Sequence, residues 1–102
     1  MTSKQRQEAF DHLHHLIKKG DRAKVRAWTA GGGDANLRNK YGWSLLMLAA
    51  LHGRTDIVEV LLAAGANANL KNDFGDTAAG LARLKGFGRT AEAIERVMVA
   101  QP

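Results

Sequence analysis

Apolar residues in the middle of the chain are spaced as in two short helices separated by a glycine. Residues 44–52 read SLLMLAALH, an apolar run that begins with Ser44, a typical N-cap residue. Gly53 follows, at the place where a helix commonly ends in a left-handed residue. A second predicted helix covers about residues 56–64 and ends before Gly65. Its apolar stripe consists of Ile57, Val60, Leu61 and Ala64.

The next segment, residues 66–76, has a different composition. It reads ANANLKNDFGD and is rich in Asn, Asp and Gly, the residue types that favour turns. It therefore predicts an extended, hairpin-like turn. Two short antiparallel helices and one such turn form a structural unit.

This pattern recurs with a period of 33 residues. Sliding the sequence along itself by 33 gives 15 identities in 69 pairs, against about five expected from the composition, so the period is a structural signal. The triplet at 35–37 matches the triplet at 68–70. The repeated glycines, which fall where helices end and the chain turns, are Gly20 with Gly53 and Gly86, Gly32 with Gly65, and Gly42 with Gly75. The chain is therefore expected to be a stack of repeated units.

Residues 39–71, NKYGWSLLMLAALHGRTDIVEVLLAAGANANLK, resemble one full ankyrin repeat. The positions that fit that family's pattern are Gly42, Leu46, Ala49, Ala50, Gly53, Ile57, Val58, Leu61, Leu62, Gly65, Ala66 and Asn69. The resemblance implies an all-α ankyrin-repeat solenoid of stacked antiparallel helix pairs joined by hairpin-like turns. We expect a single domain, residues 1–102, with an N-terminal cap unit at about 5–38, the full repeat at 39–71 and a C-terminal cap unit at 72–102.

The chain departs from the family at its Thr-Pro-Leu-His tetrapeptide. The middle unit has SLLM at residues 44–47 and the last unit has TAAG at residues 77–80. The family's usual hydrogen bonds between successive turns depend on that histidine, which both units lack. Gly80, within a predicted helix, costs roughly 1 kcal/mol relative to Ala. It indicates either a soft last unit or a close backbone contact.

The outer units have to bury apolar side chains against the middle one. In the first unit we expect a core of Phe10, Leu13, Leu16, Ile17, Val25 and Trp28, and in the last unit one of Leu81, Leu84, Ile94, Val97 and Met98. The tail at residues 97–100 is more apolar than a cap requires. It either frays or packs on a partner or a second copy.

Composition narrows the class of protein. With 45% apolar residues, 25% charged residues and one proline, the chain is expected to fold as a globular domain, and without cysteine it forms no disulfide. The chain has no apolar run near twenty residues, and MTSKQRQEAF lacks the hydrophobic centre of a secretory signal. We expect a cytoplasmic protein.

The net charge of +5 is concentrated in the first part of the chain. Residues 1–40 hold nine Lys/Arg and four Asp/Glu, whereas residues 41–102 hold six of each. Such a basic end is either a solvated helix face or a surface that attracts an acidic partner or a polyanion.

No pattern in the sequence points to catalysis, a metal or a cofactor. His12 and His15 share a helix face but His14 points elsewhere, so the three do not form a metal site. The triplet at 31–33, Gly-Gly-Gly, lacks the Lys-Ser/Thr of a phosphate-binding loop and is expected to be a turn. No Ser, His and Asp set has a spacing typical of nucleophilic catalysis. We expect a protein that is not an enzyme.

The resemblance to ankyrin repeats implies a concave binding face of hairpin tips and first helices. Transferred position by position, it predicts partner contacts from Lys18, Lys19, Arg38, Lys40, Tyr41, Trp43, Leu51, His52, Lys71, Asp73, Phe74, Asp76, Leu84 and Lys85. Aromatic residues flanked by Arg and Lys are typical of binding hot spots. Alternatively, Tyr41 and Phe74 pack under the neighbouring turn. Packing explains Trp43 less well, because its counterpart is Asp76.

The predicted function is that of a protein-binding module or adaptor, monomeric on its own, with a partner of acidic or mixed surface. One alternative is a polyanion binder that uses basic residues of this face, namely Lys18, Lys19, Arg38, Lys40 and Lys71. A second is a small inhibitor or toxin-neutralising protein, since small free-standing ankyrin proteins of bacteria include such cases. Self-association through the apolar tail is a third.

Overall fold

The computed structural model describes the backbone of residues 1–100 and the side chains of residues 1–98. Within this range the chain forms six helices and no β-strand, which confirms the predicted all-α fold. They are α1 (Ser3–Lys19), α2 (Arg22–Ala30), α3 (Leu45–Leu51), α4 (Thr55–Ala63), α5 (Ala78–Leu84) and α6 (Gly88–Ala100).

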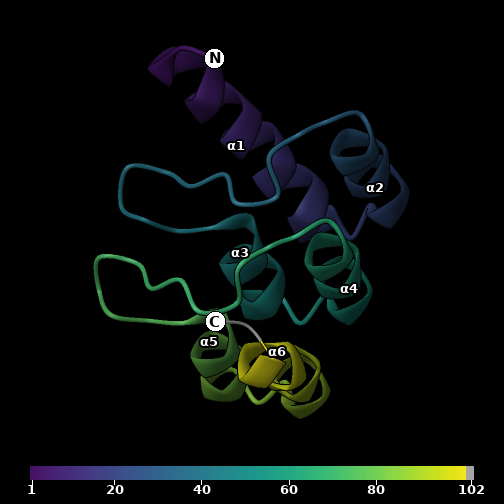
Figure 1. Ribbon diagram of the computed structural model, residues 1–102, viewed down its shortest axis with the longest axis vertical. Coiled ribbons are helices and arrows are strands. Elements are labelled where there is room, and N and C mark those ends of the chain that lie inside the picture. Colours follow the sequence, from purple (N-terminus) through teal and green to yellow (C-terminus); the bar gives the residue numbers. More distant parts are fainter. Residues whose placement is uncertain (101–102) are drawn as a thin grey trace.

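The helices stack as three antiparallel pairs (Figure 1). One layer contains α1, α3 and α5, and the other contains α2, α4 and α6. Two long turns, the first hairpin (residues 31–44) and the second hairpin (residues 64–77), project from the first layer and lie one above the other. The predicted turn at residues 66–76 lies within the second hairpin.

Hydroxyl N-caps begin the two short inner helices. Ser44 Oγ accepts the Met47 amide at 3.1 Å, as predicted from its position, and Thr77 Oγ1 accepts the Gly80 amide at 3.1 Å. Each such cap contributes about 1 kcal/mol. A Cβ added at Gly80 would meet only Thr77 Oγ1 within 4 Å, at 3.2 Å, so no close backbone contact accounts for this glycine.

The core forms between the helix layers, and most of the predicted core residues are buried in it. The predictions for Leu84 and Ala64 were wrong: Leu84 is 78% exposed, and Ala64 is exposed on the outer layer. Leu84 stands where Leu51 stands one unit earlier, at a position that faces the hairpins. Trp28, Val97 and Met98 are half-buried, and the rest of the apolar tail lies outside the described side chains.

Side chains and backbone amides tie the two hairpins together although the family's histidine is missing. The Asp73 amide donates to the Tyr41 carbonyl at 3.0 Å. Asn36 donates through Nδ2 to the Gly65 carbonyl at 3.1 Å and accepts the Asn67 amide at 2.7 Å. These bonds link residues about one repeat apart, so they hold the stacking of one turn on the next.

In the first two units, the glycine that follows the first helix is covered by a large side chain from the next unit. Gly53 has φ +64°, and a Cβ there would lie 2.9 Å from the ring of Phe87. Arg54 occupies the equivalent position one unit earlier and lies against Gly20. Its guanidinium donates to the Lys18 carbonyl at 2.6 Å, which joins the first unit to the second.

Candidate functional site

A hollow of ≈ 250 Å³ opens where the first hairpin meets α1 and α3. Its lining consists almost entirely of aromatic and aliphatic side chains: Phe10 and His14 from α1, Asn39, Tyr41 and Trp43 from the first hairpin, and Leu48 and Leu51 from α3. A concave apolar site with a few polar groups is the usual form of a recognition pocket.

Asn39 determines the shape of the hairpin at this hollow. Its Oδ1 accepts the amides of Tyr41 at 3.0 Å and Trp43 at 2.9 Å, and its own amide donates to the Trp43 carbonyl at 2.9 Å. Asparagine is favoured in turns because its side chain bonds nearby backbone in this way. These bonds hold the chain so that both aromatic residues line the hollow.

The two aromatic residues of the first hairpin differ in exposure. Tyr41 is 49% exposed, and the Lys40 Nζ lies 5.1 Å from the centre of its ring, within cation–π range. Trp43 is half-buried and packs against the core, so packing explains part of this position, although it was expected to explain Trp43 less well than Tyr41 and Phe74. Trp43 therefore forms a fixed wall of the hollow, while Tyr41 remains open to a partner.

Two histidines from adjacent units meet beside the hollow. The rings of His14 and His52 have centroids 6.0 Å apart, and those of Phe10 and His14 are 6.4 Å apart. His52 Nε2 is buried and has no hydrogen-bond partner among the described residues.

The surroundings of His52 are positively charged. Burial lowers the pKa of His52 below its ordinary value, and the nearby His14, Lys18, Arg54 and Lys85 lower it further. These groups come from α1, from the start of α4 and from the end of α5. The part of the concave face beside the apolar hollow therefore favours an anion.

The structure places the other predicted contact residues as follows. The charged side chains of Lys18, Lys19, Lys40, Lys71, Asp73 and Lys85 are exposed, as are Phe74, at 70%, and Leu84. Phe74 does not pack under a neighbouring turn, and neither it nor Leu84 lines the hollow. Only Tyr41, Trp43 and Leu51 of the predicted set come together there.

Arg38 and Asp76 make contacts within the protein. Arg38 donates from Nε to the Gly42 carbonyl at 3.1 Å and from its terminal nitrogen to the Lys71 carbonyl at 2.7 Å. The Asp76 amide and carbonyl both bond Asn72, at 3.0 and 3.1 Å. Both residues hold the turns in place in addition to any contact with a partner.

Sequence analysis missed four residues of the hollow: Phe10, His14, Asn39 and Leu48. Phe10 and His14 are four residues apart and therefore share a helix face, which was a usable signal. A second usable signal was that Asn39 matches Asn72 at the 33-residue period. What the sequence did not indicate is that this face of α1 lies against the hairpin.

Other kinds of site are not evident in the described part of the chain. No group of three or more His, Cys, Asp or Glu side chains there is arranged to hold a metal ion. His12 and His15 are exposed. No described helix is long and apolar enough to cross a membrane.

Comparison with known proteins identifies the family. The family model described as "Ankyrin repeats (many copies)" matches residues 29–82, which is more than half of the chain. The chain therefore belongs to the ankyrin-repeat family. Repeats of this family are generally protein–protein interaction modules and are typically not catalytic. The search of curated proteins finds no match.

Proposed function

We propose that this protein binds another protein by seating an apolar side chain of the partner in the hollow between Phe10, Tyr41, Trp43 and Leu51. The observation that carries the proposal is the hollow itself, an apolar recess of ≈ 250 Å³ on the face where hairpins and first helices meet. A buried apolar anchor in such a recess is the typical source of binding energy in an interface.

The charge beside the hollow indicates the partner's chemistry. Lys18, Lys40 and Lys85 are exposed; Lys40 lies against the Tyr41 ring, and Lys18 and Lys85 are among the charges near His52. An acidic side chain of the partner next to its apolar anchor would meet these groups. The proposed partner therefore carries a large apolar residue flanked by Asp or Glu, on a surface of acidic or mixed charge.

The test uses partner capture from a lysate of the source cells, identified by mass spectrometry, followed by binding measurements with the purified partner. We expect Tyr41→Ala to weaken binding at least tenfold, roughly 1.4 kcal/mol or more. Trp43→Ala is expected to abolish capture. The matched control is Phe74→Ala in the second hairpin, because Phe74 is exposed and does not line the hollow, and it is expected to leave binding within about twofold. Equal affinity for all variants would rule out the hollow as the anchor site.

Salt dependence separates this proposal from a polyanion binder. Binding through many phosphate contacts weakens by orders of magnitude between low and physiological salt, whereas a hot-spot interface changes modestly. A steep salt slope, together with loss of binding in Lys18→Gln and Lys40→Gln but not in Tyr41→Ala, would favour the polyanion function and contradict the protein-binding one.

A further inference from the structure

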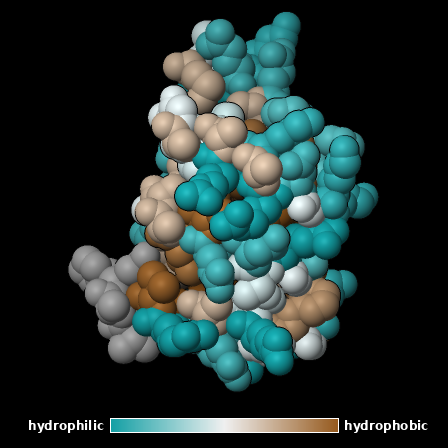
Figure 2. Space-filling view, turned by 90° about the vertical axis from the view of Figure 1, so that its right-hand side faces the viewer, coloured by the Kyte–Doolittle hydropathy of each residue, from teal (hydrophilic) through white to brown (hydrophobic). Residues whose placement is uncertain are grey.

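The outer layer of the stack carries a groove between α2 and α4, on the side away from the hairpins. It has a volume of ≈ 420 Å³ and is lined by Arg22, Arg26, Thr29 and Ala30 from α2 and by Glu59, Val60, Ala63 and Ala64 from α4 and its end. Figure 2 shows this side of the molecule, where mostly hydrophilic side chains surround small apolar areas. The groove lies across the stack from the proposed binding face.

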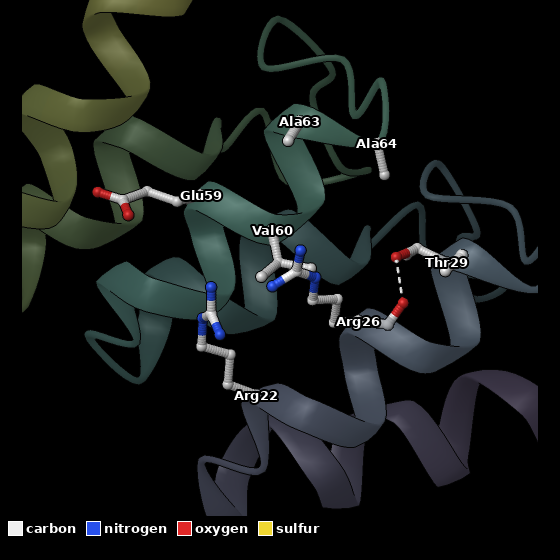
Figure 3. Close-up of a pocket in the computed structure, with 8 residues that line it drawn as sticks. Arg22, Arg26, Thr29, Glu59, Val60, Ala63 and Ala64 are labelled. Atoms are coloured by element: carbon white, nitrogen blue, oxygen red, sulfur yellow. Dashed lines mark hydrogen bonds between the residues drawn. The ribbon is translucent and has the colours of Figure 1, made fainter.

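The two arginines of the groove have no ionic partner among the residues that the structure describes. Both guanidinium groups extend from α2 toward α4, and the Glu59 carboxylate turns away from them toward α6 (Figure 3). Neither Arg22 nor Arg26 forms a salt bridge or a side-chain hydrogen bond within the described residues. The groove therefore has two free cationic groups on one wall and a floor of small apolar side chains.

The equivalent groove one unit later provides an internal comparison. It lies between α4 and α6 and has a volume of ≈ 250 Å³. At the positions of Arg26, Ala63 and Ala64 it has Glu59, Arg96 and Val97, so its charges balance and larger side chains fill it. At the position of Arg22 it has Thr55, whose hydroxyl bonds the Thr90 hydroxyl on α6 at 2.7 Å. The open, cationic character of the first groove thus comes from its own residues and not from the repeat.

We infer that the groove between α2 and α4 binds an extended acidic peptide segment in which carboxylates alternate with aliphatic side chains. Arg22 and Arg26 are one helical turn apart, about 6 Å along the axis. Residues i and i+2 of an extended peptide point to the same side at about 6.8 Å, which matches that spacing. The intervening residues then point to the opposite wall, where Val60, Ala63 and Ala64 form an apolar surface. Arginine is well suited to this role because its planar group binds carboxylates in bidentate fashion.

The experiment titrates the ¹⁵N-labelled protein with the peptide Ac-Gly-Glu-Val-Glu-Val-Glu-Gly-NH2 and follows amide and arginine side-chain signals. We expect saturable shifts confined to α2 and α4. Arg26→Glu places at this position the residue that the second groove has there, removes one of the two cationic groups, and is expected to weaken binding at least about tenfold. Ala63→Arg, which fills the groove as Arg96 fills the later one, is expected to weaken it similarly. Both sites are exposed, and circular dichroism checks that the variants fold.

Three results would overturn the inference. One is equal binding of the peptide with Gln in place of Glu. Another is an identical pattern of shifts with inorganic phosphate at the same concentration, which would make the groove a simple anion site. The third is the absence of shifts in α2 and α4. Tyr41→Ala serves as a control for the other face, because Tyr41 is exposed and its loss is expected to leave this titration unchanged, so failure here is independent of the proposed protein-binding hollow.

Discussion

The two hairpins share an internal frame but present different surfaces. In each, an asparagine side chain accepts two amides, from the residues two and four positions later: Tyr41 and Trp43 for Asn39, Phe74 and Asp76 for Asn72. The backbone is therefore nearly the same. The difference lies in what surrounds each tip.

The first hairpin faces α1, whereas the second faces the short helix α3. With 17 residues, α1 is long enough to bring Phe10 and His14 beside the hairpin, while α3 has seven residues. The hollow therefore forms at the first hairpin, and Phe74 at the second remains 70% exposed. The repeat therefore sets the shape of the turn, and the neighbouring helix α1 supplies two of the side chains that line the hollow at the first hairpin.

The largest effect on the shared frame is expected from removing its asparagines. Asn39→Ala and Asn72→Ala each leave two backbone amides without their acceptor, at a cost of about 1–3 kcal/mol in the free energy of unfolding. Urea denaturation measures this. If only one of the two substitutions lowers the free energy of unfolding, the two hairpins do not depend on the same asparagine frame. If both lower it equally and Asn39→Ala alone weakens partner binding, the frame is shared and only the first hairpin serves recognition.

The second prediction concerns the contact between the hairpins. Arg38→Ala removes two hydrogen bonds to carbonyls, one of them to the second hairpin, and is expected to lower the free energy of unfolding by about 1 kcal/mol because these bonds are exposed. Lys71 is the matched control, since it occupies the same position one unit later. Lys71→Ala is expected to change stability by less than about 0.5 kcal/mol. Equal losses in thermal or urea unfolding would contradict this asymmetry.

The third and smallest effect is a pH dependence at His52, whose counterpart one unit later is the exposed Lys85. Because the folded state lowers the pKa of His52, the unfolded chain binds the proton more readily. The stabilising contribution is therefore present above about pH 6.5 and is lost as the pH falls through the lower folded-state pKa. In His52→Gln, the midpoint temperature should fall less steeply between about pH 7 and pH 5.

Exposed His15 provides the control for that measurement. His15→Gln is expected to keep the acid-side slope of the parent protein, since the His15 side chain is exposed. An unchanged slope in His52→Gln would show that other groups cause the acid destabilisation.

The sequence predicted the helices and turns well because they depend on local signals. Ser44 caps α3 as expected, and the predicted helices in the middle unit differ from α3 and α4 by one residue at each end. The 33-residue period and the glycine at position 53 predicted where the chain turns between helices. These features depend on residues close together in the chain, so a single sequence carries them.

The site was predicted only in part because it depends on contacts between units. The transferred pattern placed Tyr41, Trp43 and Leu51 on the binding face, but the Arg38 side chain reaches a carbonyl 33 residues away. No local pattern indicates that contact. Likewise, the equivalent positions 51 and 84 both carry leucine. Leu51 lines the hollow beside the first hairpin and α1, whereas Leu84 is exposed.

The asparagine frame of the hairpins has a consequence for the evolution of recognition. Because each turn is held by Asn39 or Asn72 and by backbone bonds, the tip residues at 40, 41, 73 and 74 contribute little to folding. Their side chains are free to diverge under selection for a new target with little loss of stability. Such tolerance would let the tips of this repeat domain change while its core stays the same.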